Sequence, residues 1–177
     1  DWSSDVCSSD LFNGDAGDDT LNFNDNDAAA NVGFLSANRI WGFDMPGSDA
    51  SSKGVSYATI ELLNLKLGAR PDTVNVRGAA ANVTTTIDLG VSSTNANVVN
   101  VGSIAPAAPG NVNGILGKLI INGQSANDAL VIDDSAETAP SIGALTLSTL
   151  TGLGLGGNDP AKALQFTGIE SLAINLG

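Results

Sequence analysis

The sequence contains no histidine and a single cysteine, and only 5% of its residues are aromatic. Without histidine, the common catalytic triads lack their usual base. Basic residues are scarce as well, since seven Lys and Arg stand against 19 Asp and Glu, for a net charge of −12. This charge argues against nucleic acid or an anionic membrane surface as a partner.

No apolar run approaches the roughly 18 residues that a membrane-spanning helix needs. The chain does contain enough Val, Ile, Leu and Ala for a core, together with abundant Gly, Asn, Thr and Ser. This mixture favours many short strands joined by tight turns and disfavours long helices. We therefore expect an all-β fold, and the composition is typical of a large secreted or cell-surface protein.

Residues 1–11 resemble the in-frame translation of a short DNA sequencing adapter. We interpret this segment as non-native and base no part of the fold on it. Cys7, the only cysteine, is then not native. We expect residues 12–177 to be a fragment of a longer protein, cut at both ends.

A ten-residue pattern at 59–68 recurs at 168–177. Each copy contains Ile-Glu, then alternating apolar and polar residues, and a closing glycine. In the first copy the apolar positions are Leu63, Leu65 and Leu67. Their period of two predicts a strand with one buried face, and the second copy predicts an exposed, adhesive edge at the end of the chain.

The spacing between these two copies, which takes Ile60 to Ile169, is shared by other parts of the chain. Asn13-Gly14 recurs as Asn122-Gly123 at the same spacing, each followed by an aspartate and an alternating apolar stretch. Other strand patterns occupy 72–76, 83–90, 97–101 and 117–121, and strand pairs are expected at 33–43 and 143–153. We interpret 13–121 as one long repeat and 122–177 as part of a second.

Shorter echoes occur inside the long repeat. Residues 65–68 resemble 87–90 at an offset of 22, and 74–76 resemble 99–101 at an offset of 25. One coil of a β-solenoid takes about this length, and stacked coils bury a continuous apolar face that no single coil can bury. We predict a right-handed parallel β-helix or β-solenoid, with tandem β-sandwich modules as the alternative.

Two asparagines, Asn75 and Asn100, occupy equivalent places in this shorter repeat. We expect them to stack as a ladder at a corner of the solenoid. The alternative is that they are two exposed residues of separate strands.

Residues 14–22 resemble the calcium-binding nonapeptide of RTX (repeats-in-toxin) proteins, G-G-x-G-x-D-x-U-x. In that family, an aspartate and backbone carbonyls of the loop bind Ca²⁺ between adjacent turns of a β-roll. The resemblance implies a Ca²⁺ site at Asp15, Asp18 and Asp19, and in the degraded second copy at Asp128. The pattern departs from the family because Asp15 replaces the second glycine and only one copy is clear.

The alternative interpretation gives these aspartates a purely structural role. Asp19, Asp72 and Asp128 each lie in a turn before a predicted strand. A carboxylate at such a position can cap the turn by accepting nearby backbone N–H groups in an Asx-turn.

The long repeat as a whole resembles tandem repeats of very large bacterial surface and secreted proteins. The resemblance rests on the two Ile-Glu strands and on the aspartate-bounded strands between them. It implies an extracellular or cell-surface setting and an adhesive or structural role. Its implied partners are neighbouring repeats of the same chain, cell-surface glycans or other proteins.

A carbohydrate-binding or polysaccharide-lyase-like β-helix module is the alternative function. Such enzymes use carboxylates and basic side chains gathered on one sheet face. Asp133 and Asp134 are adjacent, so on a strand they point to opposite faces, and Asp88 is a further isolated candidate. Glu61 and Glu170 recur in both copies, which indicates a structural role. We therefore expect no catalytic residue.

Overall fold

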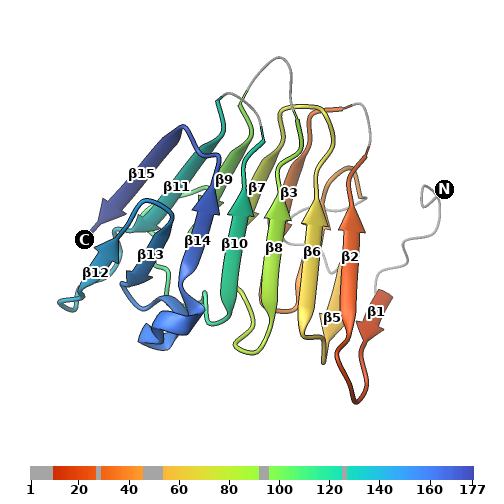
Figure 1. The fold of residues 1–177 in the computed structure, drawn as a ribbon, viewed down its shortest axis with the longest axis horizontal. Coiled ribbons are helices and arrows are strands. Elements are labelled where there is room, and N and C mark those ends of the chain that lie inside the picture. Colours follow the sequence, from red (N-terminus) through yellow and green to blue (C-terminus); the bar gives the residue numbers. More distant parts are fainter. Residues whose placement is uncertain (1–9, 27–28, 46–53, 92–95, 125–126) are drawn as a thin grey trace.

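The structure, a computed structural model, describes residues 10–26, 29–45, 54–91, 96–124 and 127–177. These residues form fifteen strands and two short 3-10 helices in two mixed sheets (Figure 1). The all-β fold expected from the composition is confirmed. Within the described ranges, every helix is too short or too polar to span a membrane.

The first sheet contains β1 (Asp10–Asn13), β3 (Val32–Leu35), β4 (Arg39–Gly42), β5 (Val55–Ala58), β7 (Thr73–Val76), β9 (Val98–Val101), β11 (Ala129–Asp134) and β15 (Ser171–Leu176). The second contains β2 (Thr20–Asn24), β6 (Leu62–Lys66), β8 (Thr84–Asp88), β10 (Lys118–Asn122), β12 (Gly143–Leu145), β13 (Thr149–Gly152) and β14 (Leu164–Thr167). The strand orders are β1-β5-β4-β3-β7-β9-β11-β15 and β12-β13-β14-β10-β8-β6-β2. The 3-10 helices η1 (Leu155–Asn158) and η2 (Pro160–Lys162) lie between β13 and β14.

From β6 to β11, successive strands alternate between the two sheets, and each is parallel to its neighbours in its sheet. Nine of the thirteen pairings between described strands are parallel. The four antiparallel pairings belong to two segments in which three consecutive strands pair antiparallel within one sheet, β3–β4–β5 and β12–β13–β14. We call each of these segments a hairpin excursion. The mainly antiparallel pairing expected of β-sandwich modules is therefore not observed in this part of the chain.

The strand registers reproduce the two short offsets found in the sequence. Leu65 pairs with Ile87 in the β6–β8 ladder, which is the predicted offset of 22. Asn75 pairs with Asn100 in the β7–β9 ladder, which is the predicted offset of 25. Each short echo in the sequence is thus a step from one strand to the next in the same sheet.

The core lies between the two sheets, where apolar side chains of period two point inward. Leu63, Leu65 and Leu67 are at most 2% exposed, as their alternation predicted. Full burial of one such leucine contributes about 2 kcal/mol of transfer free energy. The second copy behaves differently because β15 is the last strand of the first sheet: Leu172 and Ile174 are half-buried, and Leu176 is 61% exposed. The predicted exposure at this edge is confirmed.

Three strands fall outside the sequence-based expectations. β5 and β14 are absent from the predicted strands, because their alternation of apolar and polar residues, Val-Ser-Tyr-Ala and Leu-Gln-Phe-Thr, is only four residues long. β1 begins with Asp10 and Leu11, two residues of the segment interpreted as non-native, and it pairs in parallel with β5. Residues 1–9 of that segment lie outside the described part of the chain.

Candidate functional site: the acidic loops and the polar ladder

The first RTX-like loop connects β1 to β2 and is closed by its own aspartate. The Asp15 N–H donates to Asp19 Oδ2 at 3.0 Å, while Asp15 and Asp18 have exposed side chains. Gly14 packs against the next strand connection, since a Cβ at this position would lie 2.0 Å from the Thr59 carbonyl oxygen. The glycine of the motif is therefore required by close backbone approach.

Glu61 joins this loop to the neighbouring strand. The Asp19 N–H donates to Glu61 Oε2 at 2.7 Å, and the Glu61 N–H donates back to the Asp19 carbonyl oxygen at 3.1 Å. The two residues therefore hold β2 and β6 together through both main chain and side chain. A hydrogen bond to a charged acceptor of this kind contributes about 1.5 to 3 kcal/mol.

The same arrangement recurs in the second copy of the sequence pattern. Asp128 Oδ2 accepts the Gln124 N–H at 2.8 Å, and the Asp128 N–H donates to Glu170 Oε2 at 2.7 Å. A Cβ on Gly123 would lie 1.9 Å from the Gly168 carbonyl oxygen. The recurrence of Asn-Gly, Asp and Ile-Glu in the sequence is thus explained by one repeated contact between adjacent strands.

The capping interpretation holds for Asp19 and Asp128, with one difference in geometry. Each carboxylate accepts the N–H of the residue four positions earlier and so closes its loop, whereas an Asx-turn bonds an N–H two positions later. Asp72 differs more strongly. Its Oδ1 accepts the N–H of Asn31, 41 residues away, at 2.8 Å, so it joins two strand connections.

Asp72 belongs to a larger feature, a line of side chains along one corner of the fold. We call it the polar ladder; its members immediately precede the parallel strands β3, β7, β9, β11 and β15 and are Asn31, Asp72, Asn97, Asp128 and Glu170. Each backbone N–H donates to the side-chain oxygen of the next member, at 2.8, 2.9, 3.2 and 2.7 Å in that order. The first four members are at most 4% exposed.

The polar ladder solves a specific problem of this fold. The connections that lead into β3, β7, β9 and β11 turn into the first sheet at this corner, and each of the first four members of the polar ladder places a backbone N–H there. A buried N–H without a partner costs about 1 to 3 kcal/mol, and the following layer supplies the acceptor. The sequence signal was present, since an Asn, Asp or Glu precedes each of these strands, but it becomes visible only when the strands are aligned.

A second ladder was predicted from the sequence. The Asn100 amide Nδ2 donates to Asn75 Oδ1 at 3.0 Å, and the Asn75 Nδ2 donates to the Gly33 carbonyl oxygen at 3.3 Å. The stacking of the two asparagines is confirmed. Its location is corrected, because both lie within β7 and β9 and not at a corner.

The candidate catalytic carboxylates have structural partners. Asp133 Oδ2 accepts the Gly110 N–H at 2.5 Å, and Asp134 Oδ1 accepts the Val112 N–H at 3.3 Å. Both side chains are buried, and burial raises the pKa of Asp134, an effect that the Val112 N–H opposes. Asp88 lies in the other sheet, where its Oδ1 accepts from the Asn122 side chain at 2.7 Å. These three carboxylates do not converge on one site.

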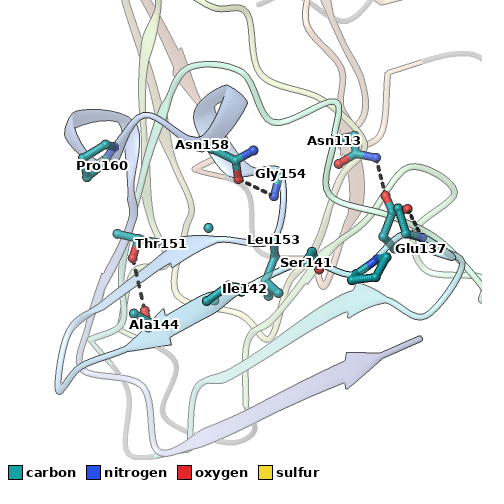
Figure 2. Close-up of a pocket in the computed structure, with 14 residues that line it drawn as sticks. Asn113, Glu137, Ser141, Ile142, Ala144, Thr151, Leu153, Gly154, Asn158 and Pro160 are labelled. Carbon is teal, nitrogen blue, oxygen red and sulfur yellow. Dashed lines mark hydrogen bonds between the residues drawn. The ribbon is translucent and has the colours of Figure 1, made fainter.

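An open hollow of about 700 Å³ lies beside the β12–β13 hairpin (Figure 2). Its polar side chains already form hydrogen bonds within the chain. The Glu137 carboxylate accepts hydrogen bonds from the Ala139 N–H, the Asn113 side-chain amide and the Thr138 N–H, and these bonds lower the pKa of Glu137. Asn158 accepts the Gly154 N–H at 3.1 Å. The residues that line the hollow therefore offer no converging set of unused polar groups that would define a ligand.

Comparisons with protein-family models, with curated proteins and with solved structures found no match to this chain. In the described ranges, no group of three or more His, Cys, Asp or Glu side chains is placed to hold a metal ion. The arrangement that recurs in this structure is the carboxylate or amide that bridges adjacent strands.

Proposed function

We propose that this chain is a β-solenoid segment of a large secreted or cell-surface bacterial protein, with a structural or adhesive role and no catalytic site. The polar ladder is the observation that carries the proposal. It places a hydrogen-bonding side chain at the same corner before five parallel strands of the first sheet, as a stacked array needs. A catalytic site would need one local cluster of functional groups.

The proposed partners are neighbouring repeats of the same chain, with cell-surface glycans or other proteins as further candidates. The edge strands of both sheets offer backbone groups for neighbouring repeats. An extracellular setting is supported by the acidic, cysteine-poor composition. It is supported too by the resemblance to bacterial surface repeats.

The main aromatic cluster of the first sheet does not by itself favour a carbohydrate platform. The Phe34 and Trp41 rings stack with centroids 5.3 Å apart. Arg39 lies over the Trp41 ring at 4.3 Å, and Arg77 lies over Phe34 at 4.7 Å. Trp41 is only 5% exposed. This cluster is better explained as packing with cation–π contacts from the chain's own arginines.

Calcium stabilisation is part of the proposal for the first acidic loop only. Asp15 and Asp18 are exposed beside Asp19, and Ca²⁺ accepts six to eight oxygen ligands in flexible geometry. The second loop is a poorer candidate, because Asp128 is fully buried and already accepts from both Gln124 and Asn97.

Small-angle X-ray scattering of tandem arrays tests the proposed role. Chains with one, two and three copies of residues 13–121 ahead of 122–177 would be compared. Each added repeat places nine strands in two sheets, so a solenoid lengthens by about 20 Å per repeat with a constant cross-section. Scattering from flexibly linked globules would contradict the proposal. Cleavage of polysaccharides with release of unsaturated products would support the lyase-like alternative.

A further inference from the structure

Corresponding strands of the two long repeats lie in opposite sheets. β2 and β6 of the second sheet recur as β11 and β15 in the first. The excursion β3–β4–β5 of the first sheet recurs as β12–β13–β14 in the second (Figure 1). One step of the long repeat therefore exchanges the two sheets.

Because the two sheets are exchanged, each sheet receives the two extra strands of one hairpin excursion. β4 and β5 insert two extra strands into the first sheet between β1 and β3, with no matching insertion between β2 and β6. β13 and β14 later extend the second sheet, with no matching insertion between β11 and β15. If both excursions entered the same sheet, that sheet would outgrow the other and the stack could not remain straight.

The exchange of the two sheets also identifies which neighbouring strands are missing at the end of the fold formed by β12 and β15. β12 ends the second sheet and β15 ends the first. Their counterparts are covered, because β3 pairs with β7 and β6 pairs with β8. Leu145 is 54% exposed, whereas its counterpart Leu35 is fully buried. Ile142 and Leu147, which flank β12, are also strongly exposed.

We propose that β12 and β15 form an interaction surface for a strand pair with the sequence pattern of β7 and β8, supplied by a further repeat. The β7-type strand pairs with β12 in the second sheet, and the β8-type strand pairs with β15 in the first. The strand pair is therefore exchanged between sheets relative to the first repeat. This inference rests on the proposed solenoid function and adds the occupant, the register and the sheet of each strand.

The registers of the first repeat define the expected contacts. Phe34 pairs with Asn75, and Ala144 is the counterpart of Phe34, so Ala144 should pair with a copy of Asn75. Asn64 pairs with Thr86, and Ala173 is the counterpart of Asn64. An apolar occupant is required, because exposed edge strands with exposed apolar side chains otherwise promote aggregation.

Hydrogen exchange of an extended chain tests whether the surface is used. Residues 69–121 would be appended after Gly177, in a background carrying Cys7→Ser to remove the competing thiol. Within 143–145 and 171–176, the amides that point away from β13 and β11 should exchange at least tenfold more slowly than in the original chain. A control with the appended strands scrambled at constant composition should show no slowing. Unchanged exchange in the extended chain would overturn the proposal.

Disulfide cross-linking then tests the sheet exchange. Ala144→Cys with cysteine at the appended copy of Asn75 should cross-link, as should Ala173→Cys with cysteine at the appended copy of Thr86. Paired positions on neighbouring strands fall within disulfide range. If Ala144→Cys instead cross-linked preferentially to the copy of Thr86, and Ala173→Cys to the copy of Asn75, the proposed exchange of strands between the two sheets would be refuted. The scattering of tandem arrays is independent of this assignment, so a rod that lacks these cross-links would reject this inference and leave the proposed function standing.

Discussion

Asp128 is the member of the polar ladder whose removal should cost the most stability. It is fully buried and accepts the Asn97 N–H, the Asn97 amide Nδ2 and the Gln124 N–H. Asp128→Ala removes the acceptor that these donors share, and each buried donor left unpaired costs about 1 to 3 kcal/mol. Because Gln124 is exposed and can turn to water, we expect a total loss of about 3 to 5 kcal/mol.

Urea denaturation followed by circular dichroism measures this loss as a shift of the unfolding midpoint. Asp15→Ala is the matched control, since it removes the same charge at an exposed position. In calcium-free buffer it should change the stability by less than about 0.5 kcal/mol. If Asp128→Ala unfolds the chain outright, Asp128→Asn provides a graded test. It keeps Oδ1 for Asn97 but turns an amide towards Gln124, which should cost about 1 to 2 kcal/mol.

The reasoning would be refuted if Asp128→Ala were no more destabilising than Asp15→Ala. Such a result would mean that water replaces the carboxylate at this corner without cost. It would also remove the observation on which the solenoid proposal rests, because the other corner contacts use the same chemistry.

Three further predictions follow from the geometry. Tyr57 is the only tyrosine; its O–H donates to the Ser36 carbonyl oxygen at 2.6 Å, and burial raises its pKa above the ordinary value of 10. The preference of the folded state for the protonated Tyr57 therefore contributes stability that is complete below pH 10 and is lost as the pH rises further. Phenolate absorbance at 295 nm should appear only with unfolding. Reversible ionisation of Tyr57 at pH 10 in the folded state would disprove this expectation. Gly123→Ala should lower the stability by several kcal/mol, because its Cβ would overlap the Gly168 carbonyl oxygen; an unchanged melting temperature would show that the two strand connections can separate freely. Ca²⁺ at a hundred times its Kd should add about 2.7 kcal/mol of stability, and Asp18→Ala should abolish the gain; no shift in melting temperature with Ca²⁺ would exclude the site in the first acidic loop.

The strands that could be predicted are those in which period two coincides with an echo elsewhere in the chain. Leu63, Leu65 and Leu67 alternate cleanly, and the echo of 65–68 at 87–90 identifies β8 as the partner of β6. β5 and β14 alternate as well, but each alternation is only four residues long and follows a segment rich in Gly, Ser or Asp, which favours a connection. The hairpins β3–β4 and β12–β13 confirm the strand pairs expected at 33–43 and 143–153, whereas the antiparallel pairings β4–β5 and β13–β14 were missed together with β5 and β14.

The polar ladder could not be deduced from any single residue. An aspartate before a strand predicts a turn cap, and Asp19 does close its own loop. Asp72 has the same local sequence character, but its partner Asn31 lies 41 residues earlier. The choice between a local and a distant N–H depends on which strand connection lies alongside, and that depends on the register of the whole stack.

The acidic character of the chain is therefore partly a structural requirement. Asp72, Asp128, Asp133 and Asp134 are buried, and each accepts at least one backbone N–H. A carboxylate has two acceptor oxygens, so it can join two strand connections at a corner where a hydroxyl would offer fewer acceptor sites. In the RTX family that the first loop resembles, a calcium ion joins adjacent turns; here the Glu61 carboxylate bonds the Asp19 N–H across the same kind of boundary. Carboxylates in such a repeat indicate contacts between strands first, and a metal site only where exposed oxygens remain.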